Sequence, residues 1–69
     1  MEVPEGCPLT WHEYRTLTLF AAGLRLRQVA AVEGRSPNTI SARRTSLKAK
    51  INAVNMNNAV AIAATKGWI

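Results

Sequence analysis

The basic side chains have the clearest chemical meaning in this sequence, and they are unevenly distributed along its 69 residues. Three of the four acids, Glu2, Glu5 and Glu13, precede Tyr14. The rest of the chain carries all nine Lys and Arg residues and a single acid, Glu33. A small domain with such a surplus of cations is typical of proteins that bind a polyanion such as nucleic acid, although basic solvated surfaces also occur without such a partner.

No other set of side chains forms a recognisable reactive site. One cysteine, Cys7, and one histidine, His12, are too few for a structural zinc site, and no disulfide can form within the chain. We interpret Cys7 as a reduced thiol in an irregular segment, with a reactive or intermolecular thiol as the alternative. Because we find neither a catalytic constellation nor a phosphate-binding loop, we expect no enzymatic activity, no metal and no cofactor.

Length and hydropathy limit the architecture and the compartment. A chain of 69 residues forms one domain at most, with a small hydrophobic core. No stretch of 18 apolar residues is present, and the acidic, proline-containing start is unlike a secretion signal. We therefore expect a cytoplasmic protein.

The basic residues must be positioned by helices, and the first of these is predicted after an irregular lead-in. Residues 1–8 hold two prolines and a glycine, so we expect no helix before the domain at 9–69. Thr10 and Glu13 have the spacing of a capping box, which predicts a helix start there, and Gly23 predicts its end. The apolar stripe of this helix is Leu17, Phe20, Ala21 and Leu24.

Three more helices follow. The second is predicted at 25–33, with Gly34 after it, and its apolar members are Leu26, Val29, Ala30 and Val32. Ser36 caps a third helix, which begins with proline and runs to about Ile51, where Asn52 supplies a left-handed exit. Asn55 caps a fourth helix near 56–66, which Gly67 ends. No segment alternates with period two, so we expect no strand.

Two helices joined by a glycine-containing turn in a basic domain suggest a helix-turn-helix. The sequence over residues 9–69 resembles the LuxR/GerE-type signature in order and spacing. The matching positions are Leu9, Thr10, Glu13, Leu17, Ala21, Gly23, Leu24, Val29, Ala30, Ser36, Thr39, Ile40, Leu47, Lys50, Ile51, Asn55, Ala59, Val60, Ala63 and Gly67.

The resemblance implies an all-α, four-helix LuxR/GerE-type domain that binds double-stranded DNA as a transcriptional regulator. Its third helix, at about 37–51, is expected to enter the major groove. Many members carry this domain behind a receiver or ligand-binding domain. The chain looks like the free-standing, GerE-like form or like a fragment of a longer regulator.

Four positions depart from the family pattern. Arg25 replaces a small capping residue, Glu33 replaces an apolar residue, Ser41 replaces a large polar residue and Arg43 replaces histidine. We expect Val32 to compensate in part for Glu33 through a small rotation of the second helix.

The third helix separates small polar residues from cations. Helical spacing places Ile40, Leu47 and Ile51 on the core side. The resemblance and this spacing together predict four base-facing residues on the other side: Asn38, Ser41, Ala42 and Thr45. The predicted phosphate contacts are Arg25, Arg27, Thr39, Arg43, Arg44, Lys48 and Lys50, and Arg35 lies in the turn before this helix. The alternative is that these are solvated charges, and for Arg43 that its stem covers apolar surface at the core edge.

The fourth helix is expected to pair with a second copy. Its side away from the core carries Asn58, Ala61, Ile62 and Thr65, and family members often form homodimers through this helix. A single exposed isoleucine is the simpler interpretation. The rival function is a protein-interaction module or antagonist that pairs with a larger LuxR-type regulator through this helix.

Overall fold

The computed structural model describes residues 2–69, which contain four helices and no strand. They are α1 (Trp11–Ala21), α2 (Leu26–Glu33), α3 (Pro37–Lys50) and α4 (Met56–Thr65). The prediction of an all-α, four-helix domain is confirmed. The predicted lead-in is irregular over residues 2–8, and its first residue, Met1, lies outside the described residues.

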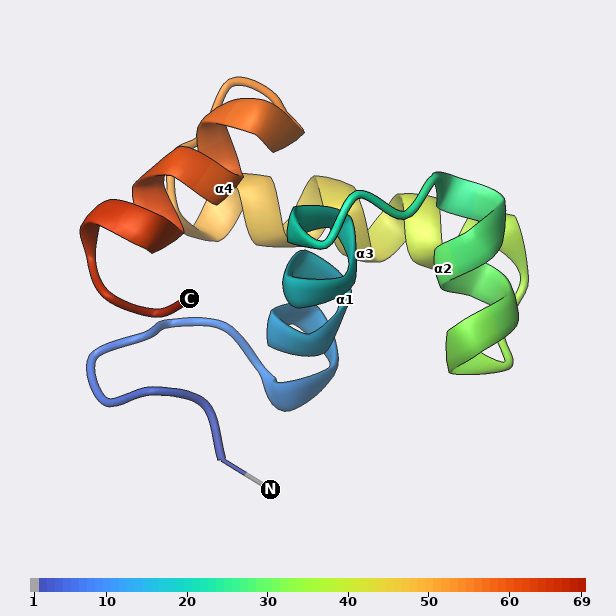
Figure 1. Ribbon diagram of the computed structural model, residues 1–69, viewed down its shortest axis with the longest axis horizontal. Coiled ribbons are helices and arrows are strands. Elements are labelled where there is room, and N and C mark those ends of the chain that lie inside the picture. The colour runs from blue at the N-terminus through green and yellow to red at the C-terminus, as the bar shows by residue number, and fades with distance from the viewer. Residues whose placement is uncertain (1) are drawn as a thin grey trace.

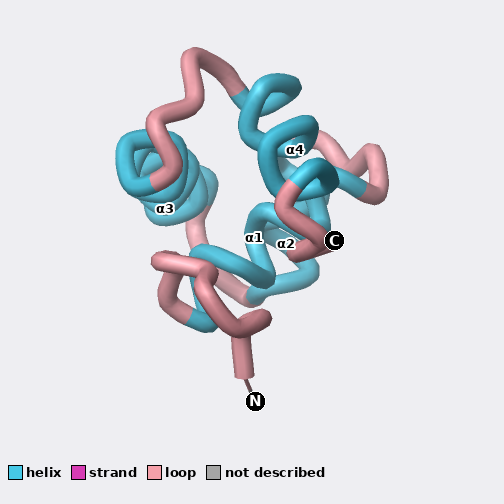
Figure 2. The backbone as a smooth tube through the Cα atoms, turned by 90° about the vertical axis from the view of Figure 1, so that its left-hand side faces the viewer, coloured by secondary structure: helices cyan, strands magenta, loops and turns pink. Residues whose placement is uncertain are grey.

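The longest helix, α3, holds the other three together (Figure 1). α2 packs near its N-terminal end and α4 near its C-terminal end, and α1 contacts all three of the other helices. Within residues 2–69, α2 and α4 do not touch. Figure 2 looks nearly along α3 and shows the other helices on one side of it, which leaves the opposite side uncovered.

Side chains cap the helices where the sequence predicts it. The Thr10 hydroxyl accepts from the Glu13 amide at 3.2 Å, and the Glu13 carboxylate accepts from the Thr10 amide at 2.9 Å, so the capping box is complete. Ser36 accepts from the Thr39 amide at 3.2 Å, and Asn55 accepts from the Asn58 amide at 2.8 Å. Each cap satisfies an amide that the first helical turn leaves without a partner.

Left-handed residues set the two turns that flank α3. Gly34, between α2 and α3, has φ 65°, which costs a glycine little because it lacks a Cβ. Asn52 has φ 58° as α3 ends, as expected for the residue type that most readily tolerates this conformation after glycine. These turns set the angle that α3 makes with α2 before it and with α4 after it.

Three helix boundaries differ from the prediction by one residue. Arg25 is the N-cap of α2, and its amide donates to the Gln28 side chain at 2.7 Å. Ile51 and Lys66 are the C-caps of α3 and α4. Helix ends commonly differ by this much, because the last turn contributes few hydrogen bonds.

The core consists of two clusters that α3 connects. The first contains Leu9, Leu17, Leu47, Ala59 and Ala63. The second contains Val29, Ala30 and Ile40. Ile40 and Leu47 are fully buried at opposite halves of α3, so this helix is anchored to both clusters. Its orientation therefore depends on the packing at both ends of the molecule.

The C-terminal segment packs on the first cluster. The Tyr14 hydroxyl donates to the Trp68 carbonyl, and the ring of Trp68 packs against the same cluster as Cys7. Cys7 is thus half-buried beside the core although it lies in an irregular segment. In Figure 1 the segment before α1 and the one after α4 accordingly lie next to each other.

Two predicted core positions are wrong. Ala21 is exposed, although Leu19 and Phe20 in the same last turn of α1 pack against buried residues of α2 and α3. Val32 is 51% exposed, whereas the side chain of Glu33 is only 9% exposed. The predicted rotation of α2 therefore does not occur, because Glu33 finds two arginines on the inner side and can be buried there.

Replacing Thr10 with alanine is expected to lower the free energy of unfolding by about 1 kcal/mol, the usual effect of removing an N-cap side chain. Thermal unfolding followed by circular dichroism measures this. Thr45→Ala, which removes the same hydroxyl from an exposed position of α3 that caps no helix, is the matched control. An unchanged melting temperature in Thr10→Ala would mean that this cap does not stabilise α1.

Candidate nucleic-acid interface

The predicted base-facing residues lie together on the uncovered side of α3. Asn38, Ala42 and Thr45 are exposed, and Ser41 is half-buried beside them. Ile40 and Leu47, on the opposite side of the same helix, are fully buried. Because residues one turn apart share a face, this surface continues to the exposed Ala49 and carries no charged side chain.

The chemistry of this outer face is that of small neutral groups. Asn38 offers an amide that can both donate and accept, as adenine requires in a major groove. The Thr45 hydroxyl donates to the Ser41 carbonyl at 3.2 Å, so its remaining capacity is to accept. Ala42 presents only a methyl group. Such a face can approach a partner closely, and it offers no cation at its centre.

One flank of α3 is tied to α1 by the carboxylate of Glu13. The Lys50 ammonium lies 2.7 Å from one Glu13 oxygen, and the Ser46 hydroxyl donates to the other. Burial raises the pKa of Glu13, but the bonds from Lys50, Ser46 and the Thr10 amide outweigh it, and with the charge of Lys50 they lower the pKa from 4.5 to about 2. Glu13 therefore both caps α1 and holds the C-terminal half of α3.

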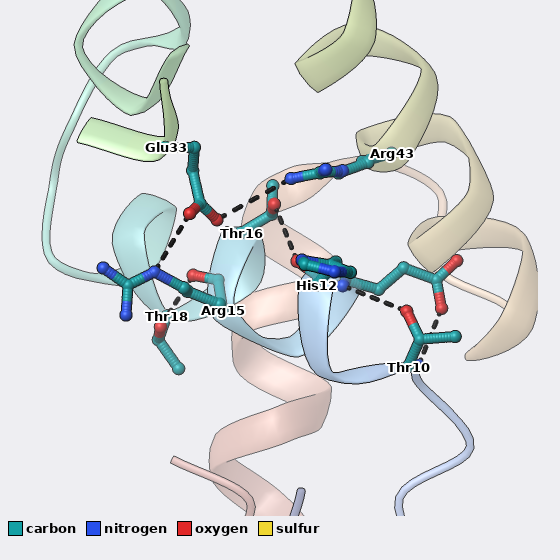
Figure 3. A network of polar contacts seen from close by, with 8 residues as sticks. Thr10, His12, Arg15, Thr16, Thr18, Glu33 and Arg43 are labelled. Atoms are coloured by element: carbon teal, nitrogen blue, oxygen red, sulfur yellow. Dashed lines mark hydrogen bonds and ion pairs between the residues drawn. The ribbon is translucent and has the colours of Figure 1, made fainter. Parts of the chain in front are cut away.

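The same flank is tied to α1 and α2 by Glu33. Figure 3 shows this carboxylate between Arg15 and Arg43. Its Oε2 accepts from Arg15 Nε at 3.0 Å, and its Oε1 lies 3.8 Å from Arg43 Nη1. The side chain of Arg43 is 17% exposed, so this ion pair is largely withdrawn from water. Three helices meet at this carboxylate.

The other flank of α3 carries cations without such partners. The guanidinium carbon of Arg44 lies 5.8 Å from the centroid of the Phe20 ring, and Lys48 is one turn further along. Arg25, Arg27 and Arg35 are exposed on α2 and around the turn. Within residues 2–69, no carboxylate pairs with any of these five cations. The Thr39 hydroxyl lies 3.1 Å from that of Ser36 at the start of α3 and is exposed.

The structure thus separates the predicted phosphate contacts into two groups. Arg43 and Lys50 already have a carboxylate partner within the chain. Arg25, Arg27, Arg44 and Lys48 do not, in the part of the chain described. The sequence interpretation overlooked Arg15 and the link between Glu33 and Arg43. The sequence does contain a signal for this link, because Glu33 and Arg43 both depart from the family pattern and carry opposite charges.

A shallow depression lies on the predicted pairing side of α4. Its volume is ≈ 300 Å³, and it is lined by Asn58, Ala61, Ile62, Thr65 and Lys66. Ile62 is half-buried along this surface, whereas Val54, in the preceding loop, is 83% exposed. The four residues predicted from the helical face therefore surround one concave surface.

Among residues 2–69, no helix is long and apolar enough to cross a membrane. In the same part of the chain, no three His, Cys, Asp or Glu side chains gather where they could hold a metal ion.

The arrangement of α2, the left-handed Gly34 turn and an α3 with one uncovered side is that of a helix-turn-helix protein. No protein-family model matches the sequence, and no curated protein matches it. Among solved structures, the chain is similar to VqmA from Vibrio cholera, which was crystallised in a complex with a ligand and DNA. The TM-score is 0.84 and the sequence identity is 24%, over 99% of this chain and 30% of the VqmA chain. The likeness supports the helix-turn-helix fold, and the chain spans less than a third of the length of that protein.

Proposed function

We propose that this chain is a LuxR/GerE-type DNA-binding domain that regulates transcription by inserting α3 into the major groove of double-stranded DNA. The observation that carries the proposal is the exposed outer face of α3 within a helix-turn-helix fold. An α-helix fits the major groove, where each base pair presents a distinct set of donors, acceptors and methyl groups. The likeness to a protein crystallised with DNA supports DNA binding.

In the proposed complex, base contacts and phosphate contacts come from different residues. Asn38, Ser41, Ala42 and Thr45 face the bases. Phosphate contacts come from the cations around them and from the exposed Thr39 hydroxyl at the start of α3. In this division the phosphate contacts position α3 on the DNA, and a few small side chains determine its sequence preference.

A titration of a labelled generic duplex at low and at moderate salt tests this function. We expect binding at low salt that weakens steeply as salt rises, since phosphate contacts release counterions from DNA. The matched control is single-stranded DNA of the same sequence, which presents no major groove. An absence of duplex binding at low salt would contradict the proposal.

We also propose that two copies pair through α4. The concave surface around Ile62 lies on the side of α4 away from the core and is lined by alanine, threonine and asparagine, with Lys66 at its edge. Pairing about a two-fold axis would bring two copies of α3 onto successive half-sites.

The same surface carries the second candidate function, a module that pairs with a larger LuxR-type regulator. The absence of a cation at the centre of the α3 outer face favours this alternative over a strong, independent reader of DNA. The duplex titration distinguishes the two functions, because only the first requires affinity for DNA.

Replacing Ile62 with glutamate is expected to weaken self-association by about tenfold or more, because the apolar contact of the isoleucine would be lost and a carboxylate would lose its hydration between the two copies. Sedimentation at high micromolar concentration measures the dissociation constant, and circular dichroism verifies that the helical content is unchanged. Val54→Glu introduces the same charge at a strongly exposed position outside the depression and is the control. A monomeric unaltered protein at these concentrations would contradict the pairing.

A further inference from the structure

Arg43 points away from the proposed DNA-binding face although it belongs to the same helix. It lies three residues after Ile40 and four before Leu47, both fully buried, so helical spacing places it on the inner side of α3. Its guanidinium is directed to Glu33 rather than to the exposed side (Figure 3). The base-facing residues occupy the opposite side of the helix.

The nearly buried carboxylate of Glu33 lies between two arginines. Its Oε1 is buried and has no hydrogen-bond partner among residues 2–69, and Arg43 Nη1 lies 3.8 Å from it. Its Oε2 is held by Arg15 at 3.0 Å. A buried carboxylate loses its hydration and is stable only while neighbouring cations compensate. The position of Arg43, and with it the rotation of α3, is therefore coupled to the end of α2 and the middle of α1.

We propose that Glu33 is a positioning residue for the proposed recognition helix. By holding Arg43 on the inner side of α3, Glu33 sets the rotation of this helix and thus the direction in which its outer face meets DNA. Phosphate binding is then left to Arg44 and Lys48 on the opposite flank. The inference rests on the proposed function, because it concerns how α3 meets DNA. It assigns a role in recognition to a residue that touches no DNA.

The salt dependence of duplex binding tests which flank contacts phosphate. Arg44→Gln is expected to reduce the slope of log affinity against log salt by roughly 0.9, the contribution of one phosphate contact. Arg43→Gln, which removes the same charge one residue away, is expected to leave the slope unchanged. An equal reduction of the slope in both variants overturns the inference.

The base preference tests the positioning role itself. Duplexes selected from a random pool by the unaltered protein define its preferred site. Glu33→Gln is expected to bind that site with at least tenfold less discrimination against other sequences, at an unchanged salt slope. A merely structural role would change the melting temperature but not the discrimination measured well below it. An unchanged discrimination in a folded Glu33→Gln variant overturns the inference.

A second variant covers the case in which Glu33→Gln does not fold. The double variant Glu33→Gln/Arg43→Gln removes both charges together and leaves no buried carboxylate, and its discrimination is expected to be equally reduced. If the unaltered protein binds no duplex at low salt, the proposed function fails and the inference falls with it. If it binds and the variants behave otherwise than expected, only the inference fails.

Discussion

Replacing Glu13 with glutamine is expected to lower the free energy of unfolding by about 3 kcal/mol at neutral pH, since lowering the pKa from 4.5 to about 2 corresponds to roughly this energy. The carboxylate holds the Thr10 amide, the Ser46 hydroxyl and the Lys50 ammonium at once. Glutamine has one carbonyl oxygen where the carboxylate has two, so it cannot accept from both the Thr10 amide and the Ser46 hydroxyl, and it carries no charge for Lys50. For a domain of this size, the loss is a large part of the total stability.

The same substitution is expected to change the pH dependence of stability. The pKa of Glu13 is lower in the folded chain than in the unfolded chain, so its contribution is fully present above about pH 4.5. The contribution is lost as the pH falls toward about 2, where the folded carboxyl takes up its proton. Between these values the unaltered protein should lose more stability than Glu13→Gln does.

Urea unfolding followed by circular dichroism at several pH values measures both effects. Glu5→Gln removes the same charge from an exposed residue and should change the stability by less than about 0.5 kcal/mol. Parallel stability curves for Glu13→Gln and the unaltered protein below pH 4.5 would show that the carboxylate is not held as described.

Replacing Ala42 with glutamate is expected to weaken duplex binding by about a hundredfold, or about 3 kcal/mol. Ala42 is exposed at the middle of the α3 outer face, where a helix in the major groove would meet base edges. A carboxylate there would lie close to the phosphates and would lose its hydration on binding. The loss should exceed that caused by removing any one cation.

A matched variant controls for the change in net charge. Ala64→Glu makes the same substitution at an exposed position of α4 that does not line the depression. It should weaken binding only as far as one added negative charge lowers the general attraction to DNA. Equal losses in the two variants would contradict the placement of α3 in the groove.

The features of the fold that the sequence predicts best are those that depend on neighbouring residues. Thr10, Ser36 and Asn55 each bond an amide three residues ahead, so their roles follow from spacing alone. The outer face of α3 is predictable for the same reason, because helical periodicity places its members without any knowledge of the partner helices.

The interactions that the sequence does not predict join residues far apart in the chain. Glu13 was recognisable as part of a capping box, but its bonds to Ser46 and Lys50 depend on how α1 crosses α3. Hydropathy places Val32 in the core and predicts that it compensates in part for Glu33. The burial of a carboxylate is favourable here only because Arg15 and Arg43 approach it from two other helices.

The two tryptophans of the chain report on only one of the two core clusters. The ring of Trp11 lies 6.2 Å from that of Tyr14, and Trp68 packs on the first cluster beside the same tyrosine. No tryptophan belongs to the second cluster, where α2 meets α3. We therefore expect tryptophan emission to respond little to opening of the α2 end of the molecule, whereas far-ultraviolet dichroism records every helix. A helical signal that melts before the emission shifts would identify the helix-turn-helix unit as the less stable half of the domain.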